Sequence, residues 1–413
     1  MGSLTTREII RIINQNAAGN YGKLPPVAIE YGGEAWVWDK EHIMYLDCMS
    51  SYAVTNFGHR HPRLVRALKS QLKQLSVCSR ALANEPFAIF CRDLAKFCDM
   101  GKVLPAVDGA GAIDKAIKVV RKWASKNNKE NPRIISFDKN FHGRTYGALS
   151  LSNNPHYKEG FGPFLDGFIT NLPFGDAANL ERTLGRTTTI NMWNNRHDDI
   201  AAIFIEPIQG EGGVIIPPDG YLKQVREFCT KYGILMVADE IQTGFGRTGY
   251  DLACQYEDVK PDIYLIGKAL GGGLLPISAV VTTDEIMNVI GPGDDGSTFG
   301  GYPLGCAVAV EAIKVLKEEG LSKSARLLGE YFLEELKKTK SSAVVEVRGR
   351  GLMIGIEVQN ELMAKKIQLE LIERRLLCGV SNSVLRLNPP LIITKDEIDW
   401  ALPRIEKVLM EAG

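Results

Sequence analysis

The sequence predicts an α/β protein with a large domain built on a mostly parallel sheet and a smaller α/β domain. Between residues 103 and 281, helical patterns alternate with short apolar runs at 133–137, 200–205, 234–238, 263–266 and 277–281. This order implies crossover connections, which join parallel strands. After Cys306 the alternation continues on a smaller scale, and 413 residues exceed what one hydrophobic core usually supports.

Elements outside the large domain follow from local patterns. Residues 6–17 predict a short helix, and alternation in VAIEYG and AWVWD predicts the strands of a small meander. Apolar residues at helical spacing predict helices at 63–75, 86–97 and 307–319. Thr394 and Glu397 form a capping box that begins the last helix. Gly349-x-Gly351 lies within a strand–turn–strand pattern, so it is not a dinucleotide fingerprint.

Bulk composition argues against several classes of function. Lys plus Arg and Asp plus Glu both number 49, so the zero net charge offers no support for a nucleic-acid or membrane-surface partner. No apolar run approaches the ~20 residues that span a bilayer, and the N-terminus lacks a secretory pattern. The eight cysteines are scattered without a C-x-x-C pair, which favours reduced thiols over a metal site. We therefore expect a cytoplasmic protein with no metal.

The stretch from 234 to 273 carries the chemistry. Asp239 ends one apolar run, and Lys268 directly follows the next. Because the carboxyl ends of parallel strands meet at one edge of a sheet, the two side chains should lie close together. A lysine and an acid in this arrangement suit pyridoxal phosphate (PLP): the lysine forms a Schiff base, and the acid keeps the pyridine nitrogen protonated. Either residue alone would be ordinary, but Ala-Leu-Gly-Gly-Gly after Lys268 lets the backbone approach a ligand closely.

DEIQTGFGRTG at 239–249, followed by GKALGGG at 267–273, resembles the signature of the class III, omega-amino-acid, PLP-dependent aminotransferases. The resemblance covers nearly all of the chain. It implies the PLP-dependent transferase fold type I, in which both chain ends build the small domain. We expect an N-terminal arm and part of the small domain at 1–49, a large PLP-binding domain at 50–305, and a C-terminal small domain at 306–413.

By this resemblance, four residues would contact the cofactor ring. Lys268 would be the Schiff-base lysine and then the general base that moves a proton from the substrate carbon. Asp239 would pair with the pyridinium nitrogen, and Gln242 would reach the phenolic oxygen. Phe141, in the motif NFHGRT, matches the family position that stacks on the ring.

The resemblance also assigns the phosphate site. A phosphate needs backbone N–H groups, ideally at a helix start, and Gly109 and Ala110 would donate them. Thr298, in GSTFGGYPLGC, matches the threonine that reaches the phosphate in the neighbouring subunit. The match thus implies a homodimer with shared active sites.

The phosphate turn departs from the family pattern. Val107 and Asp108 stand where relatives usually carry Asn or Ser and then Ser or Thr, and Gly111 stands where they carry Glu. Asp108 could cap the helix, a role worth ~1 kcal/mol. A carboxylate ~5 Å from a phosphate charge costs about 3 kcal/mol per unit charge at an effective dielectric of ~20. At that separation, PLP would bind weakly.

Five residues indicate which amine donor the enzyme would accept. Tyr21, Tyr52 and Arg144 resemble the ornithine δ-aminotransferase pattern, in which the arginine and first tyrosine hold the substrate's α-carboxylate and the second tyrosine shapes the pocket. A guanidinium matches a carboxylate bidentately. Glu211 and Arg386 resemble a switchable pair, in which the glutamate masks the arginine until 2-oxoglutarate binds.

The sequence thus predicts a dimeric enzyme that moves the δ-amino group of L-ornithine to 2-oxoglutarate. The products would be glutamate and glutamate 5-semialdehyde, which cyclises to pyrroline-5-carboxylate. Two alternatives stay open: an omega-aminotransferase for acetylornithine, lysine or 4-aminobutyrate, or a catalytically weak relative with impaired PLP phosphate binding.

Overall fold

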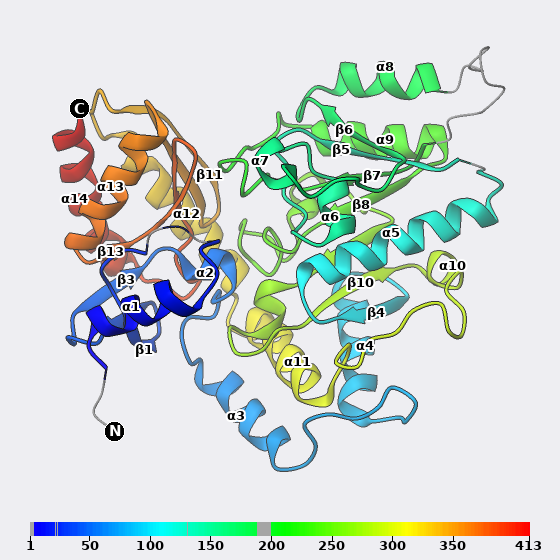
Figure 1. Ribbon diagram of the computed structural model, residues 1–413, viewed down its shortest axis with the longest axis horizontal. Helices are drawn as coiled ribbons and strands as arrows, with labels where there is room; N and C mark the ends of the chain where they lie inside the picture. Colours follow the sequence, from blue (N-terminus) through cyan, green and yellow to red (C-terminus); the bar gives the residue numbers. More distant parts are fainter. Residues whose placement is uncertain (1–3, 21, 23, 130, 188–199) are drawn as a thin grey trace.

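The structure, a computed structural model, describes residues 4–413 apart from 21, 23, 130 and 188–199 (Figure 1). Its central element is a seven-stranded sheet in the order β4-β10-β9-β8-β7-β5-β6. These strands are β4 (Lys102–Ala106), β5 (Arg133–Phe137), β6 (Phe168–Leu172), β7 (Ile200–Ile205), β8 (Leu235–Asp239), β9 (Ile263–Ile266) and β10 (Ser278–Thr282). Pairing is parallel from β9 to β6, whereas β10 runs antiparallel to both β9 and β4.

The predicted sheet is confirmed in most of its strands. The runs at 133–137, 200–205 and 263–266 are strands with the predicted bounds, and the other two runs are shifted by one residue. The pattern did not predict β4 or β6, which are the two edge strands of the sheet. Both strands are partly exposed, so their sequences KVLPA and FITNL lack the continuous apolar character of the inner strands.

Helices cover both faces of this sheet. The face that carries Phe204, Val237 and Leu265 packs against α5 (Gly109–Lys126). The opposite face packs against α4 (Glu85–Phe97) and α9 (Tyr221–Tyr232), and α11 (Pro303–Glu318) packs on α4. Because successive strand residues point to opposite faces, runs covered on both sides are apolar throughout.

Two four-stranded sheets form the second region. One has the order β1-β2-β3-β13, and the other β11-β12-β15-β14. Their bounds are β1 (Ile29–Gly33), β2 (Trp36–Asp39), β3 (Met44–Asp47), β11 (Val344–Arg350), β12 (Met353–Val358), β13 (Leu376–Leu377), β14 (Gly379–Ser381) and β15 (Val384–Leu387). Since β13 pairs parallel to β3, both chain ends contribute to this region, as expected for fold type I (Figure 1). The domain boundaries stay a prediction.

The remaining helices agree with the sequence where it predicted them, at α1, α3 and α14. They are α1 (Thr6–Asn16), α2 (Ser50–Ala53), α3 (Pro62–Leu72), α6 (Tyr146–Ser150), α7 (Pro155–Lys158), α8 (Ala177–Thr187), α10 (Asp284–Met287), α12 (Leu321–Lys337), α13 (Glu361–Glu373) and α14 (Lys395–Ala412), with short 3₁₀ helices η1 (Ala253–Glu257) and η2 (Lys268–Gly271). The capping box that begins α14 is confirmed. Gly349 and Gly351 lie at the β11–β12 hairpin, which confirms that they are no dinucleotide fingerprint.

In the described part of the chain, no helix has the length and apolar character needed to cross a bilayer.

Candidate active site

Asp239 and Lys268 lie at the carboxyl ends of neighbouring parallel strands. Asp239 is the last residue of β8 and pairs with Leu265 of β9, and Lys268 begins η2 two residues after β9 ends. Lys268 has φ = +44°, in the left-handed region that non-glycine residues rarely adopt. Strained backbone of this kind persists only where the surrounding structure holds it, and it clusters at active sites.

Several charged groups surround the Lys268 amine. Burial lowers the pKa of Lys268 from 10.5 to about 8, while the Asp239 and Glu211 carboxylates oppose that effect and the Arg386 guanidinium adds to it. These charges act on one amine, so the structure brings together residues from β8, β15 and the loop after β7. A lysine with a pKa near 8 has a substantial neutral fraction near neutral pH, which suits attack on a carbonyl.

His142 orients the Asp239 carboxylate, a contact that the sequence analysis missed. Nδ1 of His142 lies 2.8 Å from Oδ2 of Asp239, and both residues are buried. Burial disfavours the imidazolium, but the hydrogen bond to Asp239 and its negative charge raise the pKa of His142 above its ordinary value. The second carboxylate oxygen accepts from the backbone N–H of Ile241 at 3.2 Å. The only sequence signal for His142 was its place inside NFHGRT.

Glu206 is a second residue that sequence reasoning missed. It directly follows β7, as Asp239 ends β8, and it is buried. Its carboxylate accepts from the N–H groups of Phe141 at 2.8 Å and Gly210 at 3.3 Å. Burial raises the pKa of Glu206 to about 7. Glu206 therefore ties the loop carrying Phe141 to the loop carrying Glu211.

Phe141 and Arg144 lie together around a tyrosine that the sequence analysis did not select. The Arg144 guanidinium lies 3.8 Å from the ring centroid of Tyr157, and Tyr157 meets Phe141 edge-on at a centroid distance of 6.1 Å. Arg144 is exposed. Its charge is thus held above an aromatic surface while its N–H groups stay accessible to a carboxylate.

The start of α5 lies beside this cluster. A Cβ on Gly109 would contact the Ile241 side chain at 3.2 Å, and a Cβ on Gly143 would lie 2.6 Å from that of Ala110. The exposed Asp108 carboxylate accepts from the N–H of Gly111 at 2.7 Å. The capping interpretation of Asp108 is therefore confirmed.

Arg386 is fully buried and forms an ion pair with Glu211. Its Nη1 donates to Oε2 of Glu211 at 2.5 Å and to the carbonyl of Gly210 at 3.2 Å. Its Nε and Nη2 are buried without a partner among the described residues. The guanidinium also lies 4.8 Å from the ring centroid of Tyr52. A buried guanidinium with unpaired N–H groups is a site prepared for a carboxylate.

Tyr52 reaches Arg386 from a left-handed turn. All four residues of α2 have positive φ, from +47° at Ser50 to +71° at Ala53. For non-glycine residues this conformation costs about 1–2 kcal/mol each. Gln242 donates to the Tyr52 carbonyl at 3.2 Å and so connects this turn to the signature loop.

The structure does not place two predicted site residues in this cluster. Thr298 is exposed on the loop before α11 and makes no side-chain hydrogen bond with any described residue. Tyr21 lies outside the described residues. The other ten lie around the carboxyl edge of the sheet: Tyr52, Gly109, Ala110, Phe141, Arg144, Glu211, Asp239, Gln242, Lys268 and Arg386.

This arrangement fits PLP. A buried carboxylate held by a histidine suits a protonated pyridine nitrogen, and the amine of Lys268 suits an aldehyde. The start of α5 offers backbone N–H groups to a phosphate, although Asp108 already uses that of Gly111. In the described residues, no group of three or more His, Cys, Asp and Glu side chains could hold a metal ion.

Comparison with known proteins agrees with this geometry. The family model for class III aminotransferases matches residues 17–409. The chain belongs to this family. Class III aminotransferases depend on PLP, so the chain is a PLP-dependent aminotransferase.

Individual relatives within the family are similar to this chain over nearly its full length. The ornithine aminotransferase of Oceanobacillus iheyensis is 45% identical over 411 residues, covering 98% of this chain and 99% of the relative. That of Bacillus subtilis is 43% identical over 411 residues, covering 98% of both chains. The crystal structure of Toxoplasma gondii ornithine aminotransferase has a TM-score of 0.93 at 37% identity over 99% of this chain and 96% of that one. The acetylornithine aminotransferase of Elizabethkingia anophelis has a TM-score of 0.87 at 37% identity, covering 99% of this chain and 100% of that one.

Proposed function

We propose that this class III aminotransferase moves the δ-amino group of L-ornithine to 2-oxoglutarate. The products are glutamate and glutamate 5-semialdehyde, which cyclises to pyrroline-5-carboxylate. The observation that carries the proposal is the buried Arg386, paired with Glu211 and stacked on Tyr52 beside the Lys268 amine. Full-length relatives named as ornithine aminotransferases support the same donor.

PLP, when bound, carries the amino group and withdraws electrons from the substrate carbon. The chain's own residues hold and reposition what reacts there. Asp239, oriented by His142, would place a negative charge at the pyridine nitrogen. Nζ of Lys268 moves the proton from the substrate carbon, a step that needs its neutral form. Phe141 would pack on the ring, Gln242 would donate to the phenolic oxygen, and Gly109 and Ala110 would hold the phosphate.

Ornithine carries two amino groups, so the protein must select the distal one. Arg144 holds the α-carboxylate at the outer end of the site, which leaves the δ-amine facing Lys268. The family resemblance assigns Tyr21 to the same carboxylate. The exposed guanidinium of Arg144, held over Tyr157, supports this role. While ornithine is bound, Glu211 neutralises Arg386, so the inner carboxylate position attracts no α-carboxylate.

2-Oxoglutarate needs the opposite arrangement. Its α-carboxylate lies next to the carbonyl that receives the amino group, so a cation is required at the inner position. When Glu211 moves away from Arg386, the N–H groups on Nε, Nη1 and Nη2 become available to donate to that carboxylate in the plane of the guanidinium. Tyr52 stays packed against the face of the guanidinium and so keeps the Arg386 side chain in its orientation.

Two neighbouring functions serve as competing hypotheses. Another omega-aminotransferase reaction, on acetylornithine, lysine or 4-aminobutyrate, is favoured by the likeness to the Elizabethkingia anophelis structure. A catalytically weak relative is favoured by the acidic residue at the phosphate turn. The observed cap does not decide between these functions, because the Asp108 carboxylate keeps its charge while it accepts from the N–H of Gly111.

We further propose a homodimer with shared active sites, in the cytoplasm. Thr298 is exposed on its loop, as expected for a residue that reaches a partner's phosphate. The next residue, Phe299, is also exposed, at 49%. Leu82 is exposed at 65%, two residues after Arg80, whose guanidinium lies beside Gly301 of the same loop. The eight free thiols suit a reducing compartment. Sedimentation of the purified protein tests the dimer, and a monomer at micromolar concentration would contradict it.

The test of the donor is a comparison of kcat/KM for ornithine, acetylornithine, lysine and 4-aminobutyrate, each with 2-oxoglutarate. We expect ornithine to lead by at least about tenfold, because a free α-carboxylate engages the guanidinium of Arg144. Preference for another donor overturns the ornithine assignment. The variant Lys268→Ala, which should be inactive with all four, controls for background transamination.

A further inference from the structure

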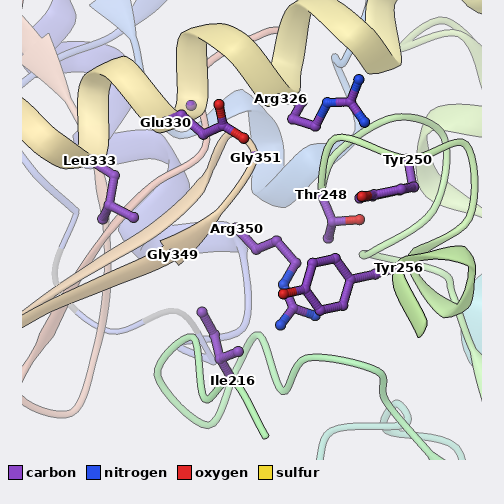
Figure 2. A pocket seen from close by; sticks show the side chains of 11 residues that line it. Ile216, Thr248, Tyr250, Tyr256, Arg326, Glu330, Leu333, Gly349, Arg350 and Gly351 are labelled. Atoms are coloured by element: carbon purple, nitrogen blue, oxygen red, sulfur yellow. The ribbon is translucent and has the colours of Figure 1, made fainter. Parts of the chain in front are cut away.

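A cavity of about 250 Å³ lies outside the active site, between α12, the β11–β12 turn and the loop after Arg247 (Figure 2). Its polar lining consists of Thr248, Tyr250, Tyr256, Arg326, Glu330 and Arg350. None of these residues has a role in the proposed reaction. Thr248 nevertheless belongs to the signature stretch DEIQTGFGRTG, whose second half the active site leaves without a function.

Two guanidinium groups line this cavity, each beside a tyrosine. The Arg350 guanidinium lies 3.5 Å from the ring centroid of Tyr256, and the Arg326 guanidinium lies 5.6 Å from that of Tyr250. Figure 2 shows Arg350 against the Tyr256 ring, with the hydroxyl of Tyr250 directed towards Thr248. Stacking occupies the face of a guanidinium but leaves its N–H edge available to a planar anion.

One hydroxyl in the wall lacks a partner. Thr248 is only 1% exposed, and its Oγ1 makes no hydrogen bond with any described residue. A buried polar atom without a partner costs about 1–3 kcal/mol, so its retention calls for a function. The ion pair of Arg350 is a long one, because the oxygen of the 83%-exposed Asp219 carboxylate lies 3.6 Å from its Nη2.

The walls are held by close backbone packing. Gly351 has φ = +56°, and a Cβ there would lie 2.4 Å from the backbone of Thr248. A Cβ on Gly329 of α12 would lie 2.1 Å from the carbonyl oxygen of Gly351. The fully buried Arg247 donates to the carbonyl of Leu352 at 2.8 Å, on the far side of the same turn. The three segments that form the cavity are therefore fixed relative to one another, which lowers the entropic cost of binding.

We propose that this cavity binds a small organic carboxylate, with Arg350, Arg326 and the Thr248 hydroxyl as its donors. Within the lining, the guanidinium groups of Arg350 and Arg326 outweigh the Glu330 carboxylate, which favours an anion. Asp219 lies outside the lining, 3.6 Å from Arg350, and solvent screens its exposed carboxylate. The tyrosine rings and Leu333 supply apolar contacts for a short carbon chain. The volume lies below the ~300–1,000 Å³ of pockets for drug-sized ligands, so the occupant is a small metabolite.

The test is calorimetric titration of the PLP-loaded enzyme with glutarate, a dicarboxylate without a reactive carbonyl. Arg350→Gln combined with Arg326→Gln should weaken binding at the cavity by at least about tenfold. Arg386→Gln should leave cavity binding unchanged, since Arg386 belongs to the active site. The proposal is wrong if glutarate does not bind, or if only Arg386→Gln removes its binding. Unchanged transaminase activity and visible absorbance of the double variant show that it is folded.

Two single substitutions sharpen the assignment. Thr248→Val removes the unpartnered hydroxyl at constant shape, so it should weaken glutarate binding severalfold without lowering the melting temperature. Glu330→Gln removes the one carboxylate in the lining and should tighten glutarate binding. Unchanged affinity in Thr248→Val, or weaker binding in Glu330→Gln, contradicts the assigned donors and the anionic class of the ligand.

Discussion

Arg386 donates Nη1 to the Glu211 carboxylate at 2.5 Å, while its Nε and Nη2 are buried without a partner among the described residues. The guanidinium is thus neutralised but only partly satisfied. A buried arginine in that state favours a second carboxylate, provided that Glu211 leaves. This relationship makes substrate selection a competition between one carboxylate of the protein and one of the substrate.

Glu211→Gln should remove that competition. The amide keeps the side-chain shape but loses the charge, so Arg386 becomes available to any α-carboxylate. We expect the ratio of half-reaction rates, ornithine over glutamate, to fall by at least about tenfold, because a charged hydrogen bond is worth about 1.5–3 kcal/mol. Single-turnover absorbance measurements give both rates. Glu357→Gln, which removes the charge of the carboxylate on β12 that pairs with Arg348 on β11, is the matched control and should leave the ratio unchanged.

The lowered pKa of Lys268 predicts how the cofactor-free protein responds to pH. Burial lowers this pKa from 10.5 to about 8, so the native protein releases a proton before the unfolded chain does. At pH 7 the buried charged amine therefore lowers the free energy of unfolding by about 3 kcal/mol. Lys268→Met should therefore raise the free energy of unfolding by up to that amount below pH 8, and the gain should fade between pH 8 and 10.5.

Denaturant unfolding of the cofactor-free protein at pH 7 and pH 9.5 measures this difference. The matched control is Lys260→Met, at an exposed lysine paired with Asp99, where the change should stay within about 0.5 kcal/mol. Equal effects of Lys268→Met at both pH values would contradict the assigned burial of the amine.

His142 should act as a positioning residue through Asp239. His142→Leu removes the 2.8 Å hydrogen bond, so kcat/KM should fall by about 10–100-fold. His142→Asn returns an N–H near the position of Nδ1 and should restore part of the loss. The visible spectrum of bound PLP and its pH dependence should shift in His142→Leu. A loss of stability with an unchanged spectrum would instead indicate a purely structural role.

Asp108→Thr should tighten PLP binding. Threonine also caps helices, so α5 keeps its start while a negative charge near the phosphate disappears. Equilibrium dialysis of PLP measures the change. Asp176→Thr is the matched control, since Asp176 accepts from the N–H of Asn179 in α8, another helix start. Unchanged affinity in Asp108→Thr would mean that the carboxylate lies too far from the phosphate to repel it.

The sequence by itself determined the inner strands and the two site residues at their carboxyl ends. Continuous apolar runs mark strands covered on both faces, so the ends of β8 and β9, and with them Asp239 and Lys268, could be placed from local pattern alone. The sequence also allowed Asp108 to be predicted as a helix cap, beside the alternative that it repels the phosphate. This was possible because capping depends on neighbours three residues apart.

Tertiary structure alone decided which distant side chains meet. The His142–Asp239 bond, the Glu206 contact to Phe141 and the Tyr52–Arg386 stack join residues far apart in the chain. No periodicity encodes such contacts, because each depends on strand order and on burial that raises the cost of an unpaired charge. The left-handed turn of Tyr52 has the same origin: its local sequence disfavours that conformation, and only the packing around it holds the turn in place.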